Sequence, residues 1–307
     1  LSFLFLKIFS ILCIVFTCLL WFSKPSESYL IYTLTIVAIA NLFYELSLIF
    51  YNSLLKSITN NQNIGKSSGY SFGLGYVGGI IILILCIKLF IDTENPLFEI
   101  SKKNFENIRV SALVVGLWYL VFALPFLFFS KDLNKQKFEN LNLKFKNIKE
   151  LVWDNGLNNL GKFLLARMLY VDGLNAIIVM GGIFAVGVFK LEISDLLILS
   201  VLMNITAFIG AIIGGYLNDK YYSKKIIIFS LLGLIFSSTL ILISETKHFF
   251  FIFASINGFF IGPIQSASRV FVIKNVDLIK QSSGFGLFAF SGKITSFIGP
   301  LLVSSIT

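Results

Sequence analysis

Two apolar stretches joined by a short basic turn decide the fold of this chain. Residues 194–216 read SDLLILSVLMNITAFIGAIIGGY, and residues 225–243 read KIIIFSLLGLIFSSTLILI. A helix needs about 20 mostly apolar residues to cross a bilayer, and each stretch reaches that length. The turn between them contains Asp219 and Lys220, which belong in water. This pattern predicts a helical hairpin that crosses a membrane twice.

The same pattern repeats along the whole chain. Apolar residues make up 56% of the 307 residues and charged residues 13%, whereas soluble domains have roughly 45–50% and about 25%. A soluble fold of this size could not hide so much apolar surface, so that surface is expected to face lipid. The sequence therefore predicts an all-α, polytopic membrane helical bundle with nine spans. The predicted spans are residues 4–22, 29–52, 68–91, 109–129, 163–187, 194–216, 225–243, 248–270 and 284–305.

One connection, residues 130–162, is too long and too charged to be a simple turn. We predict a cytoplasmic linker there, between a partial N-terminal bundle (residues 1–129, four spans) and a partial C-terminal bundle (residues 163–307, five spans). Lysine-rich connections fall on one side through all nine spans, and the positive-inside rule assigns that side to the cytoplasm. The abundance of Phe, Ile, Lys and Asn is typical of an AT-rich genome, which favours a bacterial inner (plasma) membrane.

Residue usage argues against several other functions. The chain has one histidine, His248, at the edge of an apolar run, and three cysteines inside apolar runs without a second ligand at metal spacing. It contains neither an H-E-x-x-H nor a G-x-S-x-G motif, so we predict no enzyme activity, no metal site and no cofactor. The net charge of +9 comes from lysines between apolar runs, so the predicted partner is the lipid bilayer rather than nucleic acid.

A glycine-rich stretch has the spacing of a nucleotide motif but the wrong context. Gly73, Gly75 and Gly78 spell G-x-G-x-x-G, which binds dinucleotides only between a strand and a helix. Here no strand precedes the glycines, and one apolar run follows them. Small residues every four positions instead predict a close helix-packing face in lipid. The glycines concerned are Gly65, Gly69, Gly73, Gly75 and Gly79.

Polar side chains lie deep inside several apolar runs. A charge near the bilayer centre costs roughly 2.5–3.5 kcal/mol on insertion scales, so it normally faces protein or water and marks a pathway. These residues are predicted either to take part in transport or to form structural pairs between helices, such as Asp172 with Lys293 or Glu45 with Arg167. The set comprises Asn41, Glu45, Arg167, Asp172, Asn175, Asn257, Gln265, Arg269 and Lys293.

Spacing relates some of these residues to each other. Asn41 and Glu45 are four residues apart, and Asp172 and Asn175 three apart, so each pair shares a helix face. Arg167 and Asp172 are five apart, about 140° around the helix, and are not expected to pair with each other.

Two Gly-Pro pairs are expected to bend their helices. Gly262-Pro263 lies in the run 248–270, and Gly299-Pro300 lies in the run 284–305. Proline removes a helix hydrogen bond, and membranes tolerate the kink where neighbours or water satisfy the freed carbonyl. These bends would serve either as hinges during transport or as static curvature.

The loop after residue 214 resembles the signature loop of the major facilitator superfamily. That signature has a glycine, an aspartate four residues later and a basic cluster, which here are Gly215, Asp219, Lys220, Lys224 and Lys225. The glycine that usually follows the first basic pair is replaced by Tyr222 or Ser223, which weakens the match. The resemblance implies a gating or loop-holding role for these residues.

Wider segments resemble the vacuole-effluxer-like branch of that superfamily. They include residues 167–175, 262–269 and 291–300, and residues 43–52 and 73–79 in the first half. The resemblance implies twelve spans, with two more before Leu1 and one after Thr307. It also implies that the runs 29–52, 163–187 and 248–270 line a central cavity.

The resulting expectation is a secondary transporter that moves a small solute by alternating access. Substrate binding or proton coupling is predicted at Asn41, Glu45, Asp172, Asn175, Asn257, Gln265 and Lys293. A neutral amino acid as substrate, and a coupling proton or cation, come from the resemblance alone. The alternative is a scaffold or sensor with a transporter-like fold that binds a solute without moving it.

Overall fold

The computed structural model describes residues 2–91, 100–129, 148–299 and 301–302. Within these ranges every regular element is a helix, apart from one isolated β-bridge between Trp153 and Leu157. Eight of the described helices are long and apolar enough to cross a membrane. The predicted all-α, polytopic membrane bundle is therefore confirmed.

The long helices follow the predicted runs closely and extend beyond them by several residues at some ends. This is expected, because a helix continues through the polar interface while the apolar count stops at the hydrocarbon core. Their bounds are α1 (Ser2–Leu19), α2 (Leu30–Ile58), α3 (Ile64–Cys86), α4 (Glu106–Phe129), α6 (Asn159–Phe189), α7 (Ile193–Lys220), α8 (Ser223–Leu242), α9 (Lys247–Asn275) and α10 (Gln281–Lys293).

The last helix is shorter than the predicted run 284–305. α10 ends at Lys293, and turns occupy residues 294–297 before helical backbone resumes at Ile298. The predicted span is thus interrupted several residues before the Gly299-Pro300 pair. Pro300 itself and residues 303–307 lie outside the described part of the chain.

Local sequence signals explain where several helices begin. The Asn158 side chain caps α6 by accepting a hydrogen bond from the Gly161 N–H at 2.9 Å. α7 opens with a reciprocal capping box between Glu192 and Asp195. Thr246 caps α9 by accepting from Phe249 N–H at 3.4 Å. These caps satisfy backbone donors that a helix start leaves without a partner.

The chain divides into two compact units that differ from the predicted halves. The N-terminal unit comprises residues 1–52 and 81–138, and the C-terminal unit comprises residues 53–80 and 139–307. Residues 53–80, including most of α3, thus group with the later helices. The predicted linker falls mainly on residues 130–147, which lie outside the described part, while residues 148–152 are helical.

Aromatic rings and a few hydroxyls hold the N-terminal unit together. Phe9 of α1 stacks on Phe43 and Phe50 of α2, with ring centroids 6.1 and 5.9 Å apart. Tyr119 of α4 donates a hydrogen bond to the buried Ser10 hydroxyl of α1 at 3.2 Å. Apolar stacking and one buried polar contact therefore fix α1 against its neighbours.

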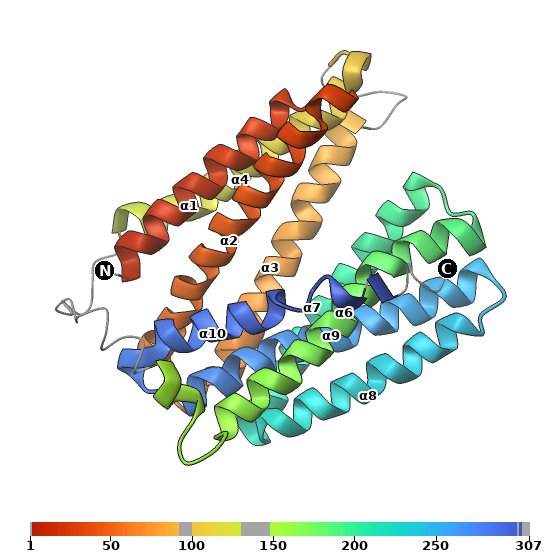
Figure 1. Ribbon diagram of the computed structural model, residues 1–307. Coiled ribbons are helices and arrows are strands. Elements are labelled where there is room, and N and C mark those ends of the chain that lie inside the picture. The colour runs from red at the N-terminus through yellow and green to blue at the C-terminus, as the bar shows by residue number, and fades with distance from the viewer. Residues whose placement is uncertain (1, 92–99, 130–147, 300, 303–307) are drawn as a thin grey trace. The chain divides into compact units, whose positions relative to one another are not determined.

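α9 is the central helix of the C-terminal unit and packs along both α7 and α8 (Figure 1). Glycines allow the close approach: a Cβ on Gly258 would lie 2.6 Å from the Met203 carbonyl oxygen of α7. A Cβ on Gly214 would lie equally close, 2.6 Å, to the Pro263 ring. α9 remains helical through Pro263, and the glycines of α7 leave room for its ring.

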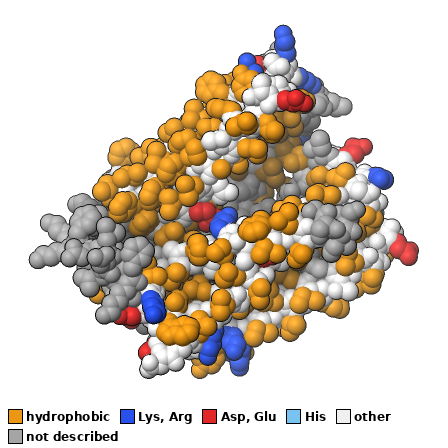
Figure 2. Space-filling model, viewed as in Figure 1, with side chains coloured by type: hydrophobic (Ala, Val, Ile, Leu, Met, Phe, Trp, Pro, Cys, Tyr) orange, Lys and Arg blue, Asp and Glu red, His pale blue; other side chains and the backbone are white. Residues whose placement is uncertain are grey.

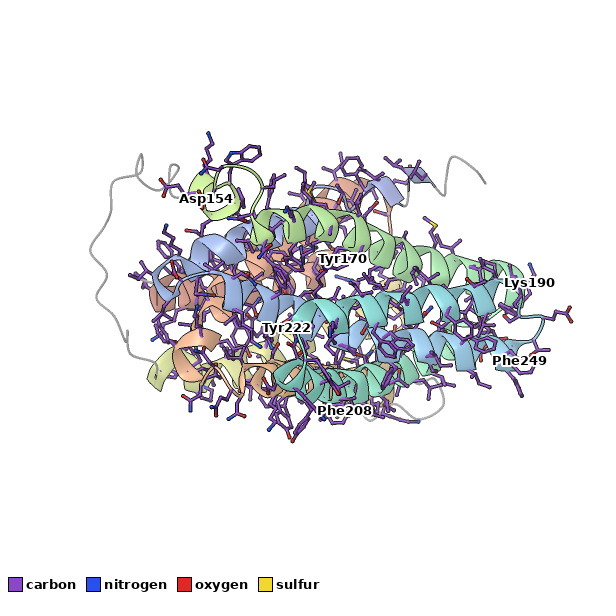
Figure 3. The ribbon with its side chains drawn as sticks, turned by 90° about the horizontal axis from the view of Figure 1, so that it is seen from below. Asp154, Tyr170, Lys190, Phe208, Tyr222 and Phe249 are labelled. Carbon is purple, nitrogen blue, oxygen red and sulfur yellow. The ribbon has the colours of Figure 1, made fainter. Side chains whose placement is uncertain are left out.

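The outer faces of the helices carry large apolar side chains. Figure 2 shows hydrophobic side chains over most of the visible surface, and exposed examples include Leu169 (76%) and Phe236 (66%). Such surface is unfavourable in water and favourable in lipid. In Figure 3, Asp154 lies in the turn that precedes α6, and Lys190 lies at the far end of that helix.

Candidate functional site

A close helix crossing in the C-terminal unit joins α3 and α7. A Cβ on Gly69 would lie 2.5 Å from the Ala211 carbonyl oxygen and 2.9 Å from Cα of Gly215. A Cβ on Gly65 would lie 2.5 Å from the Gly215 carbonyl oxygen. Real side chains do not fit at such distances, so only small residues permit this α3–α7 crossing.

Asp219 fastens one end of the α3–α7 crossing. Its two carboxylate oxygens accept hydrogen bonds from the backbone N–H groups of Gly65 at 2.6 Å and Lys66 at 2.8 Å. These N–H groups lie in the first turn of α3, where intrahelical acceptors are missing and the helix dipole favours a negative charge. The last turn of α7 thus caps the start of α3.

A buried arginine connects α9 to α3, one turn along α3 from the Asp219 contact. Arg269 is 3% exposed, and it donates to the Ser68 hydroxyl at 2.9 Å and to the Ser68 carbonyl oxygen at 2.7 Å. Its guanidinium also lies 4.3 Å from the ring centroid of Phe72. A lysine could not reproduce both the forked hydrogen bonds and the stacking.

Two more polar contacts lie near Arg269 on α9. The Tyr76 hydroxyl of α3 donates to the Gln265 side-chain oxygen at 2.8 Å. On another face of α9, Ser268 shares a hydrogen bond of 2.8 Å with Tyr170 of α6 (Figure 3 labels Tyr170). Residues 265–269 therefore join α3 and α6 through side chains, which makes this part of α9 a polar core of the unit.

A second polar cluster joins α6 to α10. Arg167 donates from Nη1 to the Phe288 carbonyl oxygen at 2.5 Å and to the Ser291 hydroxyl at 3.0 Å. Its guanidinium lies 3.5 Å from the Phe288 ring centroid, and a Cβ on Gly292 would lie 2.5 Å from Nη1. The arginine therefore lies against the last turns of α10. Only a glycine at position 292 leaves room for its guanidinium.

Asp172 contacts the segment of chain that follows the turns after α10. Its carboxylate accepts a hydrogen bond from the Gly299 N–H at 3.0 Å, and the Thr295 hydroxyl donates to the Met168 carbonyl oxygen at 2.9 Å. α6 thus contacts α10 before the turns with Arg167 and contacts the chain after them with Asp172. The predicted 140° separation of these two side chains is consistent with their separate contacts.

Other predicted residues of this unit lie elsewhere. Asn257 is 2% exposed and faces α8, where it accepts from Ser237 at 2.5 Å and donates to Ser238 at 3.2 Å. Asn175 is half-buried one turn beyond Asp172, and Lys293 is exposed at the end of α10. The structure therefore places Asn257 apart from the α6–α10 cluster.

The predicted residues of the N-terminal unit lie on α2. Asn41 is exposed and Glu45 is half-buried, one turn apart on the same helix.

The predicted packing glycines of α3 differ in their contacts. Gly73 approaches Phe208 and Ile212 of α7, whereas a Cβ on Gly75 would meet nothing within 4 Å. Gly75 lies two residues on, roughly 200° around the helix, so it faces away from the crossing. A Cβ on Gly79 would have one contact, 3.8 Å from Asn204.

The basic residues after Asp219 are exposed. Lys220 ends α7, and Lys224 and Lys225 lie in the first turn of α8. No group of three metal-binding side chains occurs among the described residues.

Sequence reasoning did not identify several residues that complete these clusters. Ser68, Tyr76, Tyr170 and Thr295 supply the partners of the predicted side chains. Their signal in the sequence is weak, because serine, threonine and tyrosine are common within membrane helices. The hydroxyls at Ser266 and Ser268, next to a deep arginine, are the one local hint of a polar face.

Comparison with known proteins places the chain in a family. A family model described as "Vacuole effluxer Atg22 like" matches residues 4–307. This chain belongs to that family. The resemblance noted from the sequence is thereby confirmed.

Relatives occur in bacteria and yeasts. The "Uncharacterized MFS-type transporter YxiO" of Bacillus subtilis (strain 168) is 25% identical over 289 residues, which cover 91% of this chain and 65% of the relative. "Autophagy-related protein 22" of Kluyveromyces lactis is 25% identical over 323 residues, with 94% and 64% covered. Its namesake from Vanderwaltozyma polyspora is 26% identical over 279 residues, with 78% and 51% covered. The chain spans about half to two thirds of the length of these relatives.

Proposed function

We propose that this protein is a secondary transporter that carries a small solute across a membrane by alternating access. The observation that carries the proposal is the α3–α7 crossing with its Asp219 cap. This contact joins a helix of the first sequence half to one of the second, and a few hydrogen bonds at the helix ends hold it. In this proposal the crossing is the closed gate on the lysine-rich side, and it opens once in each transport cycle.

The α6–α10 cluster is the proposed substrate and coupling region. The interruption after Lys293 leaves irregular backbone inside a predicted span, which membranes tolerate where it lies within protein or lines a water-filled cavity. Broken helices of this kind carry binding sites in many transporters. In this proposal Asp172 and Asn175 contribute substrate or proton contacts. Glu45 and Asn41, on α2 of the N-terminal unit, are proposed separately as residues for substrate binding or proton coupling.

The proposed substrate class is neutral amino acids, and the proposed direction is efflux. The description of the family as vacuole effluxers supports efflux as the direction, and neutral amino acids follow from the family resemblance noted in the sequence. A carboxylate at Asp172 suits the ammonium group of an amino acid. The proposed location is a bacterial plasma membrane with the lysine-rich turns in the cytoplasm, which the positive-inside pattern supports.

The alternative is a scaffold or sensor that binds the solute without moving it. No described feature favours it specifically, although deep polar residues would serve binding equally well. Counterflow separates the two, because a binding-only protein does not exchange labelled for unlabelled solute.

The test is amino-acid counterflow in proteoliposomes that contain the protein expressed from its complete reading frame. We expect labelled neutral amino acid to accumulate against an excess of unlabelled amino acid inside, and empty liposomes to show no accumulation. Absence of exchange for every neutral amino acid, with or without a proton gradient, would contradict the substrate assignment. Absence of exchange for every small metabolite tested would contradict the proposal that the protein is a transporter.

Two variants of Asp172 separate the effect of its charge from the effect of its hydrogen bond with the Gly299 N–H. Asp172→Asn keeps an oxygen that can accept the Gly299 N–H but removes the carboxylate charge, whereas Asp172→Ala removes both. We expect both variants to lower counterflow at least about tenfold, because binding of an ammonium or proton needs the charge. Normal counterflow in Asp172→Asn with loss in Asp172→Ala would assign Asp172 a purely structural role. Asp154→Asn, in the exposed turn before α6, is the matched control.

A further inference from the structure

The outer face of the α3–α7 crossing carries two exposed tyrosines that meet. Tyr70 and Tyr216 are each 46% exposed, and their hydroxyls lie 2.7 Å apart with ring centroids at 6.1 Å. The glycines at the crossing bring the two backbones together, which lets these side chains touch on the lipid side. Since one hydroxyl donates to the other, the pair offers one remaining O–H donor to a ligand at this surface.

Two lysines flank this pair on the same end of the helices. Lys66 Nζ lies 5.1 Å from the ring centroid of Tyr216, and Lys220 Nζ lies 5.6 Å from that of Tyr221. The nearby carboxylate, Asp219, accepts backbone N–H groups of α3 with both oxygens. Within the part of the chain that the structure describes, neither lysine forms an ion pair with a carboxylate, so both positive charges remain available to an anion.

Apolar side chains continue from the tyrosines toward the middle of the helices. Leu74 lies one turn from Tyr70 on α3, and Ile213 and Ile209 lie one and two turns from Tyr216 on α7. Their exposed fractions are 69%, 43% and 43%. Because residues three or four apart share a helix face, a polar head and an apolar strip lie in line along the crossing.

We propose that this surface binds an anionic phospholipid of the cytoplasmic leaflet. The one O–H donor that the Tyr70–Tyr216 pair leaves free donates a hydrogen bond to the headgroup phosphate, and Lys66 and Lys220 neutralise the charge of the phosphate. The acyl chains lie along Leu74, Ile213 and Ile209. Lysines and tyrosines at this depth match the chemistry of an anionic interface. Since the headgroup contacts both α3 and α7, a bound lipid stabilises the conformation in which the two helices cross.

Native mass spectrometry of the purified protein in detergent tests this proposal directly. We expect the wild-type protein to retain phosphatidylglycerol in preference to phosphatidylcholine. Lys66→Gln/Lys220→Gln should weaken phosphatidylglycerol binding about twenty-five-fold, since each lysine near an anionic surface contributes about fivefold. Tyr70→Phe/Tyr216→Phe should weaken it by a smaller factor, because only the hydroxyl donors are lost.

The control is Lys24→Gln/Lys103→Gln, which removes two exposed lysines from the predicted opposite side of the membrane. Lys24 also lies over a tyrosine ring, at 5.8 Å from the Tyr29 centroid, so the local chemistry is matched. This variant should bind phosphatidylglycerol as the wild type does. Equal binding by wild type and Lys66→Gln/Lys220→Gln, with both eluting as folded protein in size-exclusion chromatography, would overturn the proposal. So would displacement of the lipid by inorganic phosphate, which would indicate a site for small free anions.

Discussion

Replacing Asp219 with alanine is expected to lower the transport rate at least about tenfold in proteoliposomes, although the helices still fold. The carboxylate makes two hydrogen bonds to the start of α3, and a hydrogen bond to a charged group contributes about 1.5–3 kcal/mol. A change of about 1.4 kcal/mol already shifts a two-state equilibrium tenfold, so the closed gate would be strongly depopulated. Initial rates of amino-acid counterflow measure the effect.

Asp219→Asn refines this prediction, because an amide oxygen can still accept one N–H but carries no charge. Its transport rate should fall between those of the wild type and Asp219→Ala. Asp154→Ala removes a carboxylate from the exposed turn before α6 and should leave the rate unchanged. A wild-type rate in Asp219→Ala would show that the cap on α3 has no part in the transport cycle.

Gly69→Ala is expected to destabilise the protein, although it adds only one methyl group. That methyl would lie 2.5 Å from the Ala211 carbonyl oxygen and 2.9 Å from Cα of Gly215, so backbone must move to admit it. Overpacking of this kind typically costs about 1–3 kcal/mol. Thermal unfolding in detergent, followed by tryptophan fluorescence, should show a midpoint several degrees below that of the wild type.

Gly75→Ala is the matched control for this substitution. It lies in the same helix, and its added methyl would meet nothing within 4 Å. Alanine is a better helix former than glycine by about 1 kcal/mol, so Gly75→Ala should unfold at the same temperature as the wild type or slightly higher. Equal losses in both variants would contradict this account, because they would show that close packing at the α3–α7 crossing does not determine the loss.

The membrane helices were largely predictable because their signal is local. A run of about 20 apolar residues must be helical in lipid, since its backbone has no other hydrogen-bond partners there. The interruption after Lys293 was not predicted. Its position depends on Arg167, Asp172 and Thr295, which form contacts between segments more than 120 residues apart.

The partners of the deep polar residues also could not be predicted from the sequence. Asn257 was expected in a cavity, but a rotation of about 100° per residue decides which neighbour a side chain meets, and in the structure it faces α8. Asp219 was identified from its loop, whereas its backbone partners lie about 150 residues earlier in the chain. Patterns of residue type indicate that a site exists, and tertiary packing decides its contacts.

Cross-linking of the α3–α7 crossing is the most direct test of the proposed gate. Tyr70 and Tyr216 meet with hydroxyls 2.7 Å and ring centroids 6.1 Å apart, so a reducible bifunctional thiol reagent should cross-link Tyr70→Cys/Tyr216→Cys in a variant whose native cysteines are replaced by serine. Phe229→Cys/Phe260→Cys joins α8 to α9 over a similar ring separation of 6.0 Å, at a contact that is not expected to open. We predict that the first cross-link stops counterflow, that cleaving it restores counterflow, and that the second has no effect. Undiminished counterflow with the first cross-link fully formed would contradict a gate at this crossing.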